Sequence, residues 1–122
     1  MPIFSIDWKT NLTKKNGNMN QFDVYLVDLD PTKGAEIKKM RPAIIISPDA
    51  MNRNLKTVII APLTQTEKGY PSRVASVFAG QAGEIVLDQI RAVDKSRLKQ
   101  KRGKLDAVTI HNIKKVLAVM FS

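Results

Sequence analysis

The stretch FDVYLVDLDPTKGAEIKKMRPAIIISP, residues 22–48, decides the predicted fold. In residues 22–28 Phe22, Val24 and Leu26 alternate with a second set of side chains, which predicts a strand with one buried face. Asp30-Pro31 ends this strand, because proline has no N–H for the ladder. Residues 42–48 form a continuous β-branched run, typical of a buried strand. Residues 30–41 are therefore predicted to be a long polar loop between two strands.

The same patterns of apolar residues predict the elements in the rest of the chain. KTVIIAP (56–62) is a second buried run and SRVASVF (72–78) alternates, so both are predicted strands, while EIVLDQIRAV (84–93) continues as one or two more. A turn or short helix is expected at 48–54, a second polar loop at 63–71 and a turn at 79–83. The pattern becomes helical after Asp106, a good N-cap, with apolar residues at Ile110, Ile113, Val116, Leu117 and Met120.

These elements predict a mainly β protein of about five or six short strands with a C-terminal helix. Because regular βαβ alternation is missing, the expected architecture is a small, curled antiparallel barrel with the helix packed on it. A chain of 122 residues makes one domain, here residues 21–122. Residues 1–20 have no periodicity and are predicted to be a poorly ordered extension; packing of Phe4 and Trp8 on the core is the alternative.

The amino-acid composition excludes several classes of function. Without cysteine there are no disulfides, thiolate nucleophiles or cysteine-based zinc sites, and a single histidine cannot form a multi-histidine metal site. We therefore expect neither a metal nor a cofactor. No apolar run approaches the length of a membrane span, and the first 20 residues contain no secretory signal. A cytoplasmic protein without membrane contact is the resulting prediction.

Charge points to an anionic partner. The chain has 20 Lys and Arg against 11 Asp and Glu, a net charge of +9. Residues 91–104 (RAVDKSRLKQKRGK) carry seven of the positive charges and one negative charge. This excess favours nucleic acid or another acidic partner. A solvated basic face is the alternative.

Standard catalytic signatures such as GxSxG, HExxH, the Walker loop and GxGxxG are absent from the sequence. The informative residues lie in two loops, 28–48 and 61–71. They contain VDLDPTKG followed by Glu36, then RPAIIISP, then the segment from Thr64 to Pro71 with its KGYP; LDQIRAVD comes later. From about Met19 to its end, the chain resembles the MazF/PemK family of toxin endoribonucleases from type II toxin–antitoxin systems.

This resemblance implies an SH3-like β-barrel of the CcdB/MazF type and a homodimer formed through a hydrophobic surface. It also implies metal-independent, sequence-specific cutting of single-stranded RNA, most often mRNA, by an mRNA interferase. Attack of the 2′-hydroxyl would leave a 2′,3′-cyclic phosphate and a 5′-hydroxyl. A co-expressed antitoxin is implied as the partner, and the charge of this chain predicts an acidic one.

The resemblance also implies the catalytic residues. Arg41 and Thr64 match the MazF-type arginine and threonine, which act on the reacting phosphate. Glu36, the carboxylate nearest to Arg41 along the chain, is a candidate base or a partner that orients Arg41. The histidine and arginine of the Kid/PemK type are missing, since Ala35 and Val86 occupy those positions. We therefore expect the MazF-type mechanism.

RNA contacts outside the reacting phosphate are predicted from residue type and position. Loop cations can follow the RNA backbone, and an amide or an aromatic ring can read unpaired bases. The candidates are Lys33, Lys38, Lys39, Gln65, Lys68 and Tyr70. Two functions of other classes remain open: a CcdB-like gyrase poison acting through its C-terminal helix, and a non-catalytic nucleic-acid-binding module.

Other polar residues have simpler interpretations. His111 is expected on the solvent side of the helix. The Asp88-Gln89 pair is expected to stabilise a turn or a neighbouring loop. Asp30 has the position of a turn residue, which explains it better than an acid/base pair with Asp28.

Overall fold

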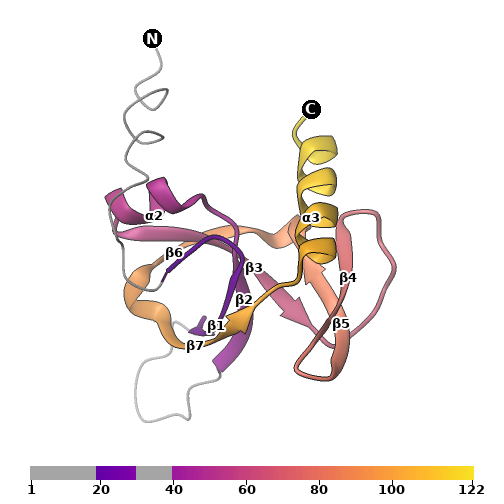
Figure 1. Ribbon diagram of the computed structural model, residues 1–122, viewed down its shortest axis with the longest axis horizontal. Helices are drawn as coiled ribbons and strands as arrows, with labels where there is room; N and C mark the ends of the chain where they lie inside the picture. Colours follow the sequence, from indigo (N-terminus) through magenta and orange to yellow (C-terminus); the bar gives the residue numbers. More distant parts are fainter. Residues whose placement is uncertain (1–18, 30–39) are drawn as a thin grey trace.

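The strands form a curled antiparallel sheet that combines segments from both halves of the chain. The computed structural model describes residues 19–29 and 40–122. β1 (Asp23–Asp28) pairs with β2 (Met40–Ile45) on one side and with β7 (Leu98–Lys104) on the other (Figure 1). β2 pairs in turn with β3 (Thr57–Thr64). The sheet order is β4-β5-β3-β2-β1-β7, and β6 also pairs with β3.

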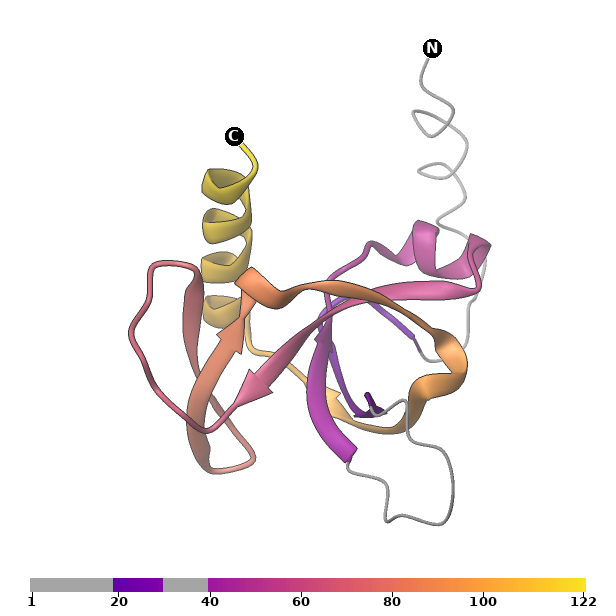
Figure 2. The same ribbon diagram turned by 180° about the vertical axis from the view of Figure 1, so that it is seen from behind.

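The long strand β3 joins two parts of the molecule. Its first residues pair with β6 (Arg91–Asp94), and its last two, Leu63 and Thr64, pair with β5 (Gln81–Val86). β5 forms a hairpin with β4 (Arg73–Phe78). Figure 2 shows β3 running from the curled part of the sheet to this hairpin. The end of β3 is therefore a junction between the two parts.

Short helical segments connect several of the strands, and a longer helix forms the C-terminal end of the chain. α2 (Asp49–Asn54) links β2 to β3, while the 3₁₀ turns η2 (Leu87–Gln89) and η3 (Lys95–Arg97) flank β6. α3 (Ala107–Met120) packs beside β4 (Figure 1). The Asp106 carboxylate accepts a hydrogen bond from the Thr109 backbone N–H at 3.3 Å, which confirms the predicted N-cap. A hydrogen bond from the Thr109 side chain and, to a smaller extent, the one from its backbone N–H lower the pKa of Asp106.

Two hydrophobic clusters form the core. One lies under α3 and includes Val24 and Ile113, and the other lies inside the curled sheet and includes Val27. The predicted single buried face of the first strand is wrong, because β1 buries side chains on both faces. The sheet curls around one face of β1, while α3 and the β4–β5 hairpin help to enclose the other.

The predicted fold class is confirmed: a mainly β chain with a C-terminal helix and a curled, half-barrel sheet. The structure describes seven strands, more than predicted: β5 and β6 correspond to the one or two strands expected at 84–93, but β7, in the basic stretch 91–104, was not predicted. β7 pairs with β1 through its backbone, but Leu98 is its only buried residue. Its sequence therefore shows no alternation of apolar and polar residues from which a strand could be predicted. The turn expected at 79–83 is shorter, because Ala79 and Gly80 make it with φ of 52° and 79° and β5 begins at Gln81.

The described chain begins two residues before the predicted domain start. Met19 packs on the cluster inside the curled sheet, and its carbonyl accepts a hydrogen bond from the Asn52 side chain at 3.3 Å. Residues 1–18, with Phe4 and Trp8, lie outside the described residues. In the part of the chain that the structure describes, no helix has both the length and the apolar character needed to cross a membrane.

Candidate active site

A groove of about 570 Å³ opens at the junction where β2 begins and β3 ends. Its walls come from β2, β3, the residues after β3, the start of β4 and the end of β5. Arg41 and Thr64 both line it, as does Gln65. Both predicted catalytic residues that fall in the described chain therefore face one space. Both were predicted at the ends of polar loops but are strand residues, because β2 begins at Met40 and β3 extends to Thr64.

Strand register explains why Arg41 and Thr64 meet. In the antiparallel pair of β2 and β3, Ile44 lies opposite Ala61 and Ala43 lies opposite Pro62. Each step toward the start of β2 is a step toward the end of β3. Continued for two more steps, this register leads from position 43 to 41 and from 62 to 64, which agrees with Arg41 and Thr64 lining one groove. Residues 23 positions apart in sequence are thus carried to one side of the sheet by rigid strand ends, which hold side chains more accurately than loops do.

The chemistry of this pair suits an anion. Arg41 is exposed, and among the described residues no carboxylate lies within ion-pair distance of its guanidinium. A guanidinium is permanently charged and presents donors in a planar fork that matches phosphate oxygens. The Thr64 Oγ1 accepts a hydrogen bond from the Thr66 backbone N–H at 3.2 Å, so its own hydrogen can be donated into the groove.

A second arginine on the groove wall is held by carboxylates. Arg73 lies 3.8 Å from the Glu84 carboxylate and 3.4 Å from Asp88. Its guanidinium carbon also sits 4.9 Å from the centre of the Tyr70 ring. Asp88 accepts a further hydrogen bond from the Ser72 hydroxyl at 2.9 Å. The interpretation of Asp88 as a residue that stabilises a neighbouring loop is thereby confirmed.

Buried Glu84 anchors the loop after β3. It is 4% exposed, and its carboxylate accepts backbone N–H bonds from Lys68 at 3.0 Å and Gly69 at 2.8 Å. These two bonds, together with the nearby Arg73 guanidinium, lower the pKa of Glu84. At Asp88 burial acts to raise the pKa, but the Ser72 and Arg73 contacts outweigh it and the pKa is lowered. The loop is thus tied to the hairpin by charge-assisted hydrogen bonds.

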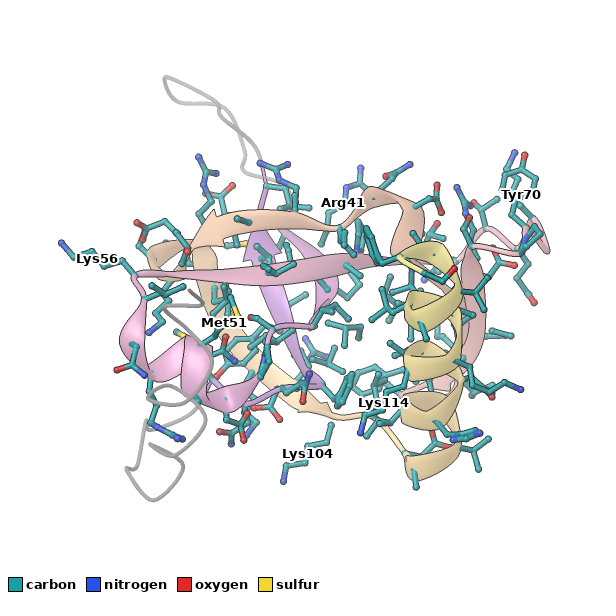
Figure 3. All side chains as sticks on the ribbon, turned by 90° about the horizontal axis from the view of Figure 1, so that it is seen from above. Arg41, Met51, Lys56, Tyr70, Lys104 and Lys114 are labelled. Carbon is teal, nitrogen blue, oxygen red and sulfur yellow. The ribbon has the colours of Figure 1, made fainter. Side chains whose placement is uncertain are left out.

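The remaining candidates are distributed around this groove. Lys68 and Tyr70 belong to the anchored loop but do not line the groove, and Tyr70 is half-exposed. Figure 3 shows Tyr70 at one end of the molecule, Lys56 at the other and Arg41 between them. His111 is exposed, as predicted. The other candidates lie outside the described residues: Lys33, Glu36, Lys38 and Lys39.

Sequence reasoning missed Arg73, Glu84 and the lining position of Gln89. The one available signal was Glu84, a carboxylate directly before the apolar run IVL in a predicted strand. A carboxylate in a buried strand almost always has a hydrogen-bond or ion-pair partner, so this position predicts one for Glu84. Among residues 19–29 and 40–122, no three His, Asp or Glu side chains gather closely enough to hold a metal ion.

Comparison with known proteins gives the family. Residues 20–121 match the family described as PemK-like, MazF-like toxin of type II toxin–antitoxin system. Endoribonuclease MazF of Staphylococcus saprophyticus is 38% identical over 89 residues, which are 68% of this chain and 74% of that protein. Endoribonuclease MazF of Staphylococcus epidermidis is 39% identical over 85 residues, or 65% of this chain and 71% of that protein.

Solved structures agree with the fold. An endoribonuclease from a mycobacterial species, in complex with its cognate antitoxin, superposes with a TM-score of 0.73 at 26% identity, covering 85% of this chain and 95% of that one. A MazE–MazF structure from Deinococcus radiodurans gives a TM-score of 0.71 at 25% identity and covers 84% and 95% of the two chains.

The fold and the family match together define a toxin endoribonuclease, the class predicted from the sequence. The chain belongs to the PemK/MazF family of type II toxin–antitoxin systems.

Proposed function

We propose that this chain cuts single-stranded RNA, chiefly mRNA, at specific short sequences without a metal ion. The observation that carries the proposal is that Arg41 and Thr64 line one groove from two adjacent strand ends. We propose the cytoplasm, where mRNA is translated, as the place of action.

The proposed reaction uses the RNA's own nucleophile. The ribose 2′-oxygen attacks the adjacent phosphorus while a base removes its proton, and the P–O5′ bond breaks as the departing oxygen takes up a proton. The products are a 2′,3′-cyclic phosphate and a 5′-hydroxyl. Arg41 stabilises the charge that builds on the non-bridging oxygens, and Thr64 donates its hydroxyl hydrogen to one of them. Glu36 is proposed either as the base or as the residue that orients Arg41.

The test is RNA cleavage in EDTA, with a defined RNA and sequencing gels to locate the cuts. Removing a preorganised donor to the transition state typically costs about 10²- to 10³-fold in rate, so Arg41→Ala is expected to lose that much. Lys56→Ala is the matched control, because it removes one positive charge at the far end of the molecule. Full activity of folded Arg41→Ala would refute its catalytic role. Absence of cuts by the unmodified protein would favour a gyrase poison or a binding module.

We also propose a homodimer, with an RNA groove to which both subunits contribute. Large apolar side chains exposed on or next to α3 support it: Val108 is 68% exposed, Val119 75% and Phe121 68%. Monomeric proteins seldom expose such groups together. Light scattering at micromolar concentration is expected to give twice the chain mass, and a strictly monomeric mass would contradict the proposal.

A further inference from the structure

A second hollow lies directly beside the proposed catalytic groove. It has a volume of about 260 Å³ and shares Pro42, Leu63, Thr64 and Gln65 with the groove, so the two are separated only by the end of β3. Its floor is apolar and includes Leu26, Leu63 and Phe78. Any RNA whose phosphate rests against Arg41 and Thr64 must place a neighbouring nucleotide close to this hollow.

A glycine lets the two strands beside the hollow approach each other closely. Gly83 lines it, and an ideal Cβ at this position would lie 2.2 Å from the Thr64 carbonyl oxygen. β5 therefore passes β3 more closely than a residue with a side chain allows. The β4–β5 hairpin turns tightly at Ala79 and Gly80, and Phe78, Ala79 and Gln81 beside this turn line the hollow.

Side chains that can donate hydrogen bonds line the edge of the hollow. The Gln65 side-chain amide donates a hydrogen bond to the Gln81 side-chain oxygen, which orients both amides. One N–H and the oxygen of Gln65 and the NH₂ of Gln81 remain available. Arg102, from β7, lines the same hollow and is exposed; among the described residues its guanidinium contacts no carboxylate. An apolar floor under fixed amides and a free guanidinium is the chemistry that recognises an unpaired base.

We infer that this hollow binds one unpaired nucleobase of the RNA, next to the phosphate that is cut, and that Gln81 and Arg102 read its edge. The inference rests on the proposed RNA cleavage and adds to it a position at which the enzyme discriminates between bases. The ring lies on the apolar floor, the two glutamines meet its edge, and Arg102 meets acceptor atoms on that edge.

The experiment compares the cutting pattern of the full chain and its variants on a pool of RNAs with a randomised segment, read by sequencing the cut ends. Gln81→Ala removes one amide, and Arg102→Lys keeps the charge but loses the planar fork. Each is expected to lower the preference for the favoured base at a single nucleotide position by about 5- to 100-fold, the range typical of a specific side-chain–base contact. Preferences at the other positions stay as they were.

Lys56→Ala is again the control and is expected to leave every preference unchanged. Circular dichroism and thermal unfolding establish that the variants are folded. If both folded variants keep the original preference at every position, or lose all preferences equally, the inference is overturned while the proposed function stands. If the unmodified protein makes no cuts in the pool, the proposed function fails and the inference fails with it.

Discussion

Gly83 lies where β5 passes the end of β3, and Thr64 pairs there with the next residue, Glu84. With an ideal Cβ only 2.2 Å from the Thr64 carbonyl oxygen, any other residue must push two backbones apart. Backbone cannot give way as a flexible side chain can. The absence of a side chain at Gly83 therefore allows the close approach of β5 to the Thr64 backbone at the junction.

Gly83→Ala is expected to lower the free energy of unfolding by about 1–3 kcal/mol, the usual cost of overpacking. Urea denaturation monitored by circular dichroism measures it. Ala82→Ser, one position earlier and exposed, serves as the control and should stay within about 0.5 kcal/mol of the unmodified protein. Equal stability of the two variants would mean that β5 can shift away from Thr64 without cost.

At the scale of elements, the loop after β3 depends on the β4–β5 hairpin. The Glu84 carboxylate on β5 holds the backbone N–H groups of Lys68 and Gly69, and Arg73 on β4 holds Tyr70 against its guanidinium. The loop has few apolar contacts of its own, since residues 65–70 are all exposed. Its position is therefore set by ionised Glu84 and not by burial of its side chains.

This dependence makes a prediction about pH. The pKa of Glu84 is lowered in the folded protein, so its contribution is complete above the ordinary glutamate value of 4.5 and is lost as the pH falls through the folded pKa. The unfolding free energy of the unmodified protein should decrease over this acidic range. In Glu84→Gln that decrease should be smaller, because the group no longer titrates.

Urea unfolding at several pH values between about 6 and 3 tests this prediction, spanning the ordinary pKa of glutamate. Glu67→Gln is the matched control: it removes a carboxylate from the same loop, where Glu67 is exposed. The same pH dependence in Glu84→Gln as in the unmodified protein would show that Glu84 does not hold the loop through its charge.

At the scale of the whole molecule, charge governs association. The net charge of +9 attracts RNA, and it equally attracts an acidic protein segment. Carboxylates of an antitoxin that lie on Arg41 would occupy the place of an RNA phosphate. A flexible acidic segment suits this task, because a chain that folds on binding can cover an extended surface.

We therefore expect an acidic antitoxin whose binding segment competes with RNA. Because Arg41→Ala is expected to cut far more slowly than the unmodified protein, it allows RNA binding to be measured by fluorescence anisotropy with and without the antitoxin. Adding antitoxin should displace the RNA, and its association rate should fall as salt increases. Undiminished binding of both at once would refute the overlap, and a basic binding segment would refute the charge argument.

The linear sequence was enough to predict the buried strands, the helix after Asp106 and the class of protein, because apolar periodicity, capping and the motifs around Arg41 and Thr64 are local. It did not reveal that β1 is buried on both faces or that the basic stretch pairs as β7, since both depend on how the sheet curls. The groove itself was also hidden. Arg73, Glu84 and Gly83 acquire their roles only from the crossing of β3 and β5, which brings residues distant in sequence into contact.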